Sequence, residues 1–376
     1  PVVRVHPAPQ LRRRVDRQGH RRAPPRPGRW PPHHAGRRGT PTALPEDREG
    51  RASSRADDPA HGGELAWARR RFPAAGAPWL DLSTGINPHA YPFSAPGGTV
   101  WARLPESVDI AALSEVAAVC YGAAGVENVA AVPGVQALIQ LLPRLCDPGR
   151  VAVVGPTYAE HARAWAAAGH AVEIVSGVSN LVNRFDTIVL TNPNNPDGTR
   201  HAPDVLAELG GRVVIDESYA DVASEFSLAG RVSGQTLVMR SFGKFYGLPG
   251  LRLGFAVAAP EVTARVRDAF GPWPVSGPAV AVGREALADA AWADAMRGQL
   301  TGEVSALDAV LAKAGLSVVG GTDLFRLVES HQADAVFERL GNHGILVRRF
   351  VEQPGWLRFG LPGCRTSLAR LAKALG

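Results

Sequence analysis

Lysine is nearly absent from this chain. Lys244, Lys313 and Lys373 are the only lysines, and arginine supplies 38 of the 41 basic side chains. Arginine cannot lose its proton to become a nucleophilic amine, whereas a lysine that is desolvated or close to another cation can. Lys244 follows Gly243 and precedes a glycine-rich turn. Its identity therefore indicates a chemical role for the amine, and a Schiff base with a carbonyl group is the leading explanation.

Cysteines and long apolar runs are also scarce. Cys120, Cys146 and Cys364 are odd in number and widely spaced, which argues against a disulfide framework or a metal site. The chain has no apolar run of about 18 residues, so no membrane span is predicted. These absences favour a cytoplasmic protein with reduced thiols and no membrane partner.

Positive charge is concentrated at the N-terminus. Residues 1–58 carry 14 arginines, 6 acidic residues and 10 of the 31 prolines, whereas the remainder is close to neutral. The remainder therefore gives no sign of nucleic-acid binding. Residues 1–58 are compatible with a transit peptide or an RNA-binding segment, but they show no amphipathic pattern and too little apolar surface to fold. We interpret them as a disordered tail, dispensable or read from an upstream start, and expect their deletion to leave activity intact.

From residue 129 onward, short β-branched runs alternate with helical patterns. Helices are predicted over 135–142 and 159–168, between strands over 129–132, 151–154, 171–175, 187–191, 212–216, 236–240 and 251–258. Strands separated by helices indicate a mostly parallel, doubly wound sheet that is covered on both faces. The predicted fold class is therefore α/β.

The pattern changes after Pro260. Helices are predicted over 261–270, 280–297, 304–314 and 367–375, with strands over 316–319, 324–327 and 357–359. This is typical of a smaller α+β layer. We predict an N-terminal arm over 59–94 that joins the smaller domain, a large domain over 95–262 and a small C-terminal domain over 263–376.

An acidic residue ends one of the predicted strands. Asp216 closes the run 212–216, and the carboxyl edge of a parallel sheet is where α/β proteins bind ligands. An aspartate after a strand is about as often a turn or N-cap residue. Lys244, just past the end of a later strand, makes a shared cofactor site the favoured interpretation.

Other strand ends carry polar or aromatic groups. Two Asn-Pro steps, at 192–193 and 195–196, follow the strand over 187–191, although such residues also form ordinary turns. Residues 133–137 open a helix whose free N–H groups can bind phosphate, although any glycine-containing turn looks similar. Ser241 and Arg252 add donors. Tyr158 can stack on a ring, or it is an ordinary, partly buried tyrosine.

Pyridoxal phosphate needs these groups together. It requires a lysine amine, a carboxylate at its ring nitrogen, donors for its phosphate and a flat or apolar face against the ring. The carboxylate keeps the ring nitrogen protonated and so makes the ring an electron sink. The sequence supplies each element, and we predict pyridoxal phosphate as the cofactor.

Taken together, the motifs resemble the fold-type-I pyridoxal-phosphate enzymes, the aspartate-aminotransferase superfamily, from about residue 61 to the C-terminus. The resemblance implies a large domain with a mostly parallel sheet and a smaller α+β C-terminal domain. It implies that Lys244 forms the Schiff base and that Asp216 pairs with the ring nitrogen. The other cofactor residues that it implies are Asn195 and Tyr219 at the phenolic oxygen, Tyr158 on the ring, and Gly134, Val135, Gln136, Ser241 and Arg252 around the phosphate.

Two arginines match substrate-binding positions of the superfamily. Arg358 matches its arginine for the substrate carboxylate, and Arg348 matches a second anion-binding arginine of the histidinol-phosphate aminotransferase branch. The alternative for both is a surface salt bridge, which contributes little.

Within the superfamily, the stretches 61–63, 81–88, 195–198 and 241–246 are most similar to the L-threonine-O-3-phosphate decarboxylases of cobalamin biosynthesis. This resemblance implies decarboxylation of L-threonine O-3-phosphate to (R)-1-amino-2-propanol O-2-phosphate. The candidates for binding its phosphate and carboxylate are His61, Asn87, Arg348 and Arg358. His61 is equally compatible with a solvated histidine.

Two positions depart from the aminotransferase pattern. Asp197 stands where aminotransferases usually have threonine. Leu104 stands where the aminotransferase branch has a tyrosine that reaches the cofactor phosphate of the neighbouring subunit. No cross-subunit hydroxyl is therefore assigned here, although the family resemblance implies a homodimer.

The reaction type rests on resemblance. The first alternative is an aminotransferase acting on histidinol phosphate or a similar phosphorylated amine. The second is a non-catalytic binding protein with the same fold.

Overall fold

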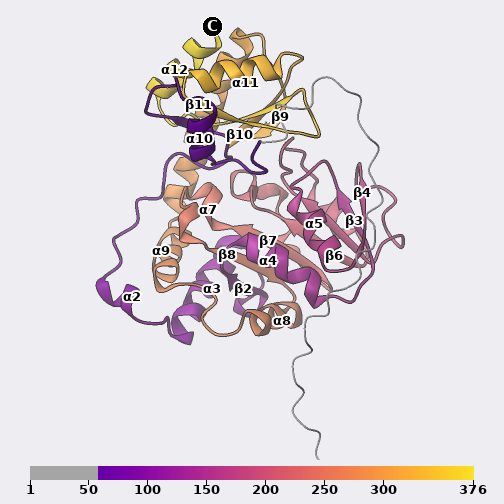
Figure 1. The fold of residues 1–376 in the computed structure, drawn as a ribbon. Helices are drawn as coiled ribbons and strands as arrows, with labels where there is room; N and C mark the ends of the chain where they lie inside the picture. The colour runs from indigo at the N-terminus through magenta and orange to yellow at the C-terminus, as the bar shows by residue number, and fades with distance from the viewer. Residues whose placement is uncertain (1–57) are drawn as a thin grey trace, which may run out of the picture. The chain divides into compact units, whose positions relative to one another are not determined.

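The structure, a computed structural model, describes residues 58–376. The predicted tail lies outside the described residues except for its last residue, Asp58, whose carboxylate forms an ion pair with Arg349. Because of this contact, the expectation that the tail can be deleted without loss of activity is kept only for residues 1–57. The described chain contains two β-sheets with helices packed against them (Figure 1). Among the described helices, none is long and apolar enough to cross a membrane.

The larger sheet has seven strands in the order β2-β8-β7-β6-β5-β3-β4. All of them run parallel except β8, which is antiparallel to both of its neighbours. The strands are β2 (Val129–Val132), β3 (Arg150–Val154), β4 (Ala171–Val175), β5 (Thr187–Thr191), β6 (Arg212–Asp216), β7 (Thr236–Ser241) and β8 (Gly254–Ala258).

Helices cover both faces of this sheet. They are α3 (Ser107–Tyr121), α4 (Val135–Leu141), α5 (Glu160–Ala167), α6 (Pro203–Ala207), α8 (Pro260–Phe270) and α9 (Gly277–Ala288), and the short helix α2 (Gly98–Ala102) packs against α9. Alternate residues of a strand point to opposite faces, so Ala130 and Val132 pack in a core with α4, α5 and α8. Val129 and Ala131 pack in another core with α3 and α9. The predicted α/β fold with a mostly parallel, doubly wound sheet is confirmed.

The smaller sheet has five strands in the order β1-β11-β12-β10-β9. Its elements are β1 (Leu80–Leu82), β9 (Ser317–Thr322), β10 (Phe325–Glu329), β11 (Ile345–Arg349) and β12 (Trp356–Gly360), with α1 (Leu65–Arg71), α10 (Ala290–Lys313), α11 (Ala333–Asn342) and α12 (Arg365–Leu375). β1, from the N-terminal arm, pairs in parallel with β11. In Figure 1 the indigo arm accordingly lies among yellow C-terminal elements. The boundaries at residues 94/95 and 262/263 stay predictions.

Two predictions for the C-terminal part are wrong. The helix expected over 280–297 ends at Ala288, because Asp289 leaves the helical conformation and its side chain accepts a hydrogen bond from the Trp292 N–H to cap α10. α10 then continues to Lys313 and includes the separate helix predicted over 304–314. The sequence analysis also missed α11 and β11.

Candidate active site

Three neighbouring parallel strands end at one edge of the larger sheet, and predicted site residues follow each of them. Thr191, the last residue of β5, lies opposite Asp216, the last residue of β6. Asn195 follows β5, Tyr219 follows β6 and Lys244 follows β7. The structure therefore gathers these groups at the carboxyl edge, where ligands of α/β proteins bind.

Asp216 is a buried carboxylate with three hydrogen bonds. Its Oδ2 accepts from His161 Nε2 at 3.0 Å, and its Oδ1 accepts from the N–H and the hydroxyl of Ser218 at 2.9 and 2.5 Å. Burial raises the pKa of this carboxyl, but the hydrogen bond and charge of His161, with the bonds from Ser218, outweigh burial and bring the pKa below its ordinary value. Asp216 is thus held as an anion that a cationic ligand group can approach.

The sequence analysis missed His161. This residue lies on α5, buried on the same side of the helix as Trp165. The i,i+4 spacing of the two residues places both on the face that packs against the sheet, which is a signal that could have been noticed. Spacing alone does not reveal which group such a histidine contacts.

Lys244 lies on the short helix α7 (Phe242–Phe245), with Nζ 5.8 Å from the centre of the Tyr219 ring. Asn87 from the arm supports the backbone here. Its N–H donates to the Lys244 carbonyl at 2.9 Å, and its side-chain amide donates to the Phe245 carbonyl at 2.8 Å. The Asn87 side chain therefore positions the lysine segment, and its predicted contact with substrate stays a prediction.

Arg358, on β12, is brought next to Asn195 and Tyr219. It is buried, and it donates from Nη1 to Asn195 Oδ1 and from Nη2 to the Ser83 carbonyl. Burial lowers the pKa of this guanidinium, against an opposing effect of Tyr219. Its Nε is buried and has no hydrogen-bond partner among residues 58–376. A buried cation that forms no ion pair with a carboxylate among the described residues is suited to an anionic ligand.

The predicted phosphate-binding residues also lie together. Gly134 has φ +81°, and a Cβ added to it would lie 2.7 Å from Arg252 Nη2. Ser241 of β7 pairs with Gly254 of β8. Gly254 in turn lies against the backbone N–H of Val135. The Arg252 guanidinium therefore lies against the start of α4, close to the end of β7.

Tyr158 borders the same region. Its hydroxyl donates to Gln136 Oε1 at 3.0 Å. Burial, and then the charges of Glu160 and Asp216, raise its pKa to about 12. The Tyr158 hydroxyl therefore stays protonated near neutral pH. The side chain lies between the start of α4 and the Asp216 carboxylate.

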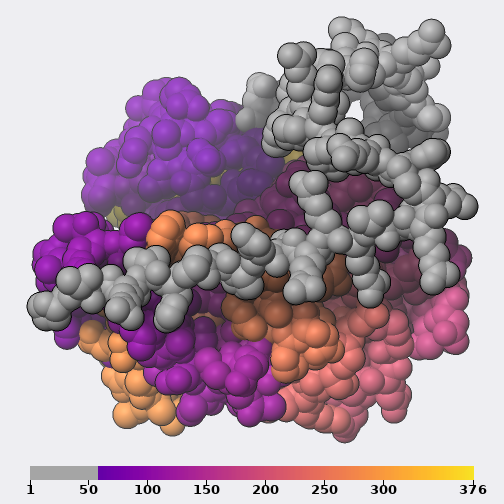
Figure 2. All heavy atoms as spheres, turned by 90° about the horizontal axis from the view of Figure 1, so that it is seen from below, coloured from indigo at the N-terminus to yellow at the C-terminus, as the bar shows by residue number. Residues whose placement is uncertain are grey.

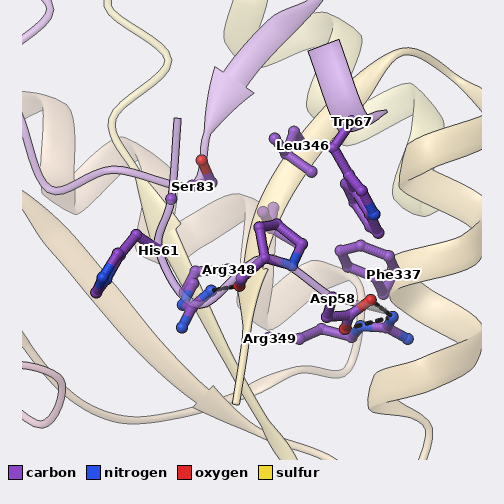
Figure 3. Close-up of a pocket in the computed structure, with 11 residues that line it drawn as sticks. Asp58, His61, Trp67, Ser83, Phe337, Leu346, Arg348 and Arg349 are labelled. Carbon is purple, nitrogen blue, oxygen red and sulfur yellow. Dashed lines mark hydrogen bonds and ion pairs between the residues drawn. The ribbon is translucent and has the colours of Figure 1, made fainter. Parts of the chain in front are cut away.

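His61 of the N-terminal arm and Arg348 line one pocket (Figure 3), and the His61 ring centre lies 5.7 Å from that of Tyr158. Arg348, on β11, lies opposite Arg358 on β12 and donates to the carbonyls of Pro59 and Ala60, each at 2.6 Å. Burial, and then the charge of Arg358, lower the pKa of Arg348 to about 10. His61 Nε2 lies 3.7 Å from a carboxylate oxygen of Glu160.

A family model described as aminotransferase class I and II matches residues 101–375. The chain belongs to this family. Enzymes of the family depend on pyridoxal phosphate, so the predicted enzyme class and cofactor are confirmed, as is the predicted superfamily.

Relatives and solved structures are consistent with this membership. A threonine-phosphate decarboxylase from a Sinorhizobium species is 42% identical over 325 residues, covering 84% of this chain and 97% of that protein. One from Pseudomonas aeruginosa is 41% identical over 327 residues, covering 84% and 96%. The histidinol-phosphate aminotransferase structure from Clostridium acetobutylicum matches with a TM-score of 0.69 at 19% identity, covering 79% of this chain and 98% of that chain. The last likeness shows the fold alone.

Proposed function

We propose that this enzyme decarboxylates L-threonine O-3-phosphate to (R)-1-amino-2-propanol O-2-phosphate, a step of cobalamin biosynthesis. The observation that carries the proposal is the pair Arg348 and Arg358, which lie opposite each other on β11 and β12. Neither forms an ion pair with a carboxylate among residues 58–376; their partners are carbonyl and amide oxygens. Two such cations match a substrate that carries both a phosphate and a carboxylate. The identity of 42% to a decarboxylase supports this substrate.

The residues at the sheet edge fit pyridoxal phosphate. Gly134 leaves room beside Arg252 that a Cβ would fill, and Asp216 is a buried anion at the strand end. We assign Lys244 to the aldehyde carbon, Asp216 to the ring nitrogen, Asn195 and Tyr219 to the phenolic oxygen, Tyr158 to the ring face, and Gly134, Val135, Gln136, Ser241 and Arg252 to the phosphate. When bound, the cofactor supplies a ring that accepts the electron pair left on the substrate Cα as CO₂ departs.

The protein decides which bond of the substrate breaks by holding its anionic groups. Arg358, fixed by Asn195 and Ser83, orients the carboxylate, and Arg348 binds the phosphate. His61, at the end of the arm, is assigned to the phosphate as well. Lys244 Nζ donates the proton that replaces the carboxylate on Cα. His161 keeps Asp216 charged throughout.

We further propose that the enzyme is a cytoplasmic homodimer. Trp101 and Trp273 are 69% and 54% exposed. Trp101 follows Val100 of α2 in the chain and Trp273 lies four residues before Gly277 of α9, and these two helices touch: a Cβ added to Gly277 would lie 2.4 Å from the Val100 carbonyl. Figure 2 shows the purple surface of α2 and α3 adjoining the orange surface of α9. Exposed tryptophans next to two touching helices favour an interface with a second copy.

The three free cysteines are consistent with the proposed cytoplasmic location. Cys120, Cys146 and Cys364 form no disulfide. Reduced thiols of this kind are typical of cytoplasmic proteins.

The direct test is to incubate the purified holoenzyme with L-threonine O-3-phosphate and to measure released CO₂ and the amine product. We expect stoichiometric release without any 2-oxo acid. Lys244→Ala is expected to abolish turnover and the visible absorbance of the bound cofactor, because the amine is lost. Lys313→Ala removes an exposed lysine at the end of α10 and serves as the control.

A different result would point to the aminotransferase alternative. Turnover that requires 2-oxoglutarate, on threonine phosphate or histidinol phosphate, with no CO₂ released, contradicts the decarboxylase proposal. Bound cofactor with no turnover of either substrate would favour a non-catalytic role.

A further inference from the structure

Residues 58–61, called the strap below, line a pocket together with Arg348 and Arg349 of the smaller sheet (Figure 3). Two consecutive arginines of β11 hold this segment. Arg348 donates to the carbonyls of Pro59 and Ala60, and Arg349 forms an ion pair with the Asp58 carboxylate at 2.6 Å. The strap is therefore fixed by side-chain contacts with a strand far along the chain, since Asp58 and Arg349 are 291 positions apart.

The ion pair of the strap is unusually well buried for charged groups. The side chains of Arg349 and Asp58 are only 4% and 8% exposed. The Arg349 guanidinium also lies 3.9 Å from the centre of the Phe337 ring, and it contacts the more exposed Asp334 at 3.2 Å. Removing Asp58 takes away the most buried of the acidic partners of Arg349, and removing Arg349 leaves the buried Asp58 carboxylate without its cation, which is unfavourable. Asp58 therefore holds the start of the strap firmly.

The other end of the strap reaches the larger sheet. His61 lies 3.7 Å from Glu160 of α5, and its ring centre is 5.7 Å from that of Tyr158. Gly62 follows directly and packs so tightly that an added Cβ would lie 2.3 Å from the Ser83 carbonyl. That carbonyl accepts the hydrogen bond of Arg358. The strap thus connects the surroundings of both substrate-binding arginines.

We propose that Asp58 and Arg349 are a positioning pair that sets His61 and Arg348 for the phosphate of the substrate. Arg349 and Asp58 satisfy each other's charge, so neither is assigned to the substrate. Both nitrogens that Arg348 offers, Nη1 and Nη2, are oriented by carbonyls of the strap. The pair therefore acts through Arg348 and His61. This inference rests on the proposed function, because it assigns the phosphate to those two residues.

The test compares Asp58→Asn with wild type in the holoenzyme. We expect KM for threonine phosphate to rise by roughly tenfold, with kcat within about twofold, because binding of the phosphate weakens while the reacting centre is unchanged. Turnover of unphosphorylated threonine, and the absorbance spectrum of the cofactor, are expected to stay as in wild type. Asp58→Glu restores the charge and is expected to recover most of the loss in KM.

Glu64→Gln is the matched control. Glu64 is an exposed carboxylate of the same arm that makes no side-chain capping bond. An effect of Asp58→Asn no larger than that of Glu64→Gln overturns the inference. So does an equal loss of activity on threonine and on threonine phosphate, which a merely structural role predicts. In Arg349→Met, the further change Asp58→Asn is expected to have little effect, and full additivity also overturns the pairing.

A readout independent of turnover separates this inference from the proposed function. Hydrogen exchange of the backbone amides of residues 60–63 is expected to accelerate in Asp58→Asn, and the dissociation constant for inorganic phosphate is expected to rise. If wild type releases no CO₂ from threonine phosphate, the proposed function fails. The positioning pair is then still supported by these two changes, and overturned if exchange and phosphate binding match those of Glu64→Gln.

Discussion

The charge on Asp216 depends on two neighbours, of which His161 has the larger effect. Burial favours the protonated carboxyl, and the hydrogen bond and charge of His161, with the two hydrogen bonds from Ser218, reverse that preference. Because the pKa of Asp216 lies below its unfolded value, its contribution to stability is present above the ordinary carboxyl pKa. That contribution is lost as pH falls through the lowered value.

Replacing His161 by leucine is expected to raise the pKa of Asp216, because burial then dominates. The holoenzyme should lose its thermal stability and its cofactor at a higher pH than wild type, and its cofactor affinity should fall by about tenfold near neutral pH. The measurement is the unfolding midpoint and the bound cofactor between about pH 4 and about pH 8. His170→Leu, which removes another buried histidine whose partners are Pro143 and Gly149, is the control. Identical pH profiles for the two variants would contradict this account.

The place of a site residue in the fold could be predicted from the sequence when that residue directly follows a predicted strand. Lys244 and Asp216 are of this kind, since the chain order of strands and polar residues places them at one edge. His161 and the Asp58–Arg349 pair are not, because their roles depend on contacts across 55 and 291 positions. The pattern of neighbouring residues in the sequence does not indicate partners that lie so far away in the chain.

Among the elements, β9 supports the backbone of the loop carrying Asn195. The Gly321 N–H donates to the Asp197 carbonyl at 2.9 Å. A Cβ on Gly320 would lie 2.1 Å from that carbonyl, and one on Gly198 would lie 2.0 Å from the Gly321 carbonyl. The two backbones approach so closely that only glycine is accommodated.

Gly320→Ala is therefore expected to destabilise the protein by about 1–3 kcal/mol, through the steric overlap, and to weaken catalysis by moving Asn195. Gly298→Ala, in the exposed part of α10 where nothing lies within 4 Å of the added Cβ, should instead stabilise by about 0.5–1 kcal/mol. Urea unfolding of both variants measures the two effects. Equal signs would show that the contact between β9 and the loop is looser than the structure indicates.

Elements were predicted best where their pattern is continuous. The strands of the larger sheet agree with their predicted ranges to within one residue, except β8, which begins at Gly254 and not at residue 251 because residues 249–251 form a 3₁₀ turn and Arg252 has positive φ. The central strands are buried on both faces, which makes each an uninterrupted apolar run. β11 was missed since it is short and ends in Arg348 and Arg349, which do not suggest a strand. The end of α9 was missed because Asp289 interrupts a sequence that otherwise remains helical.

For the whole molecule, the proposed dimer interface can be tested by replacing Trp101. Trp101→Glu places a charge on the exposed face formed by α2 and α9 and is expected to shift the enzyme from dimer to monomer in sedimentation equilibrium. Ile174→Glu, on the edge strand β4, changes an equally exposed apolar residue elsewhere and should leave the mass unchanged. A dimer that survives Trp101→Glu with unchanged affinity places the interface on another face.

The pairing of β11 with β12 determines how far apart the two proposed substrate-binding arginines lie. Arg348 and Arg358 project from directly paired positions of two strands, and each guanidinium is held by hydrogen bonds, that of Arg348 on the strap and that of Arg358 on Asn195 and Ser83, so the gap between the two groups is set. Under the proposed roles, a ligand is then selected by how far apart its two negative ends lie. A compound one carbon longer than threonine phosphate can satisfy one arginine only by leaving the other, however well the rest of it fits.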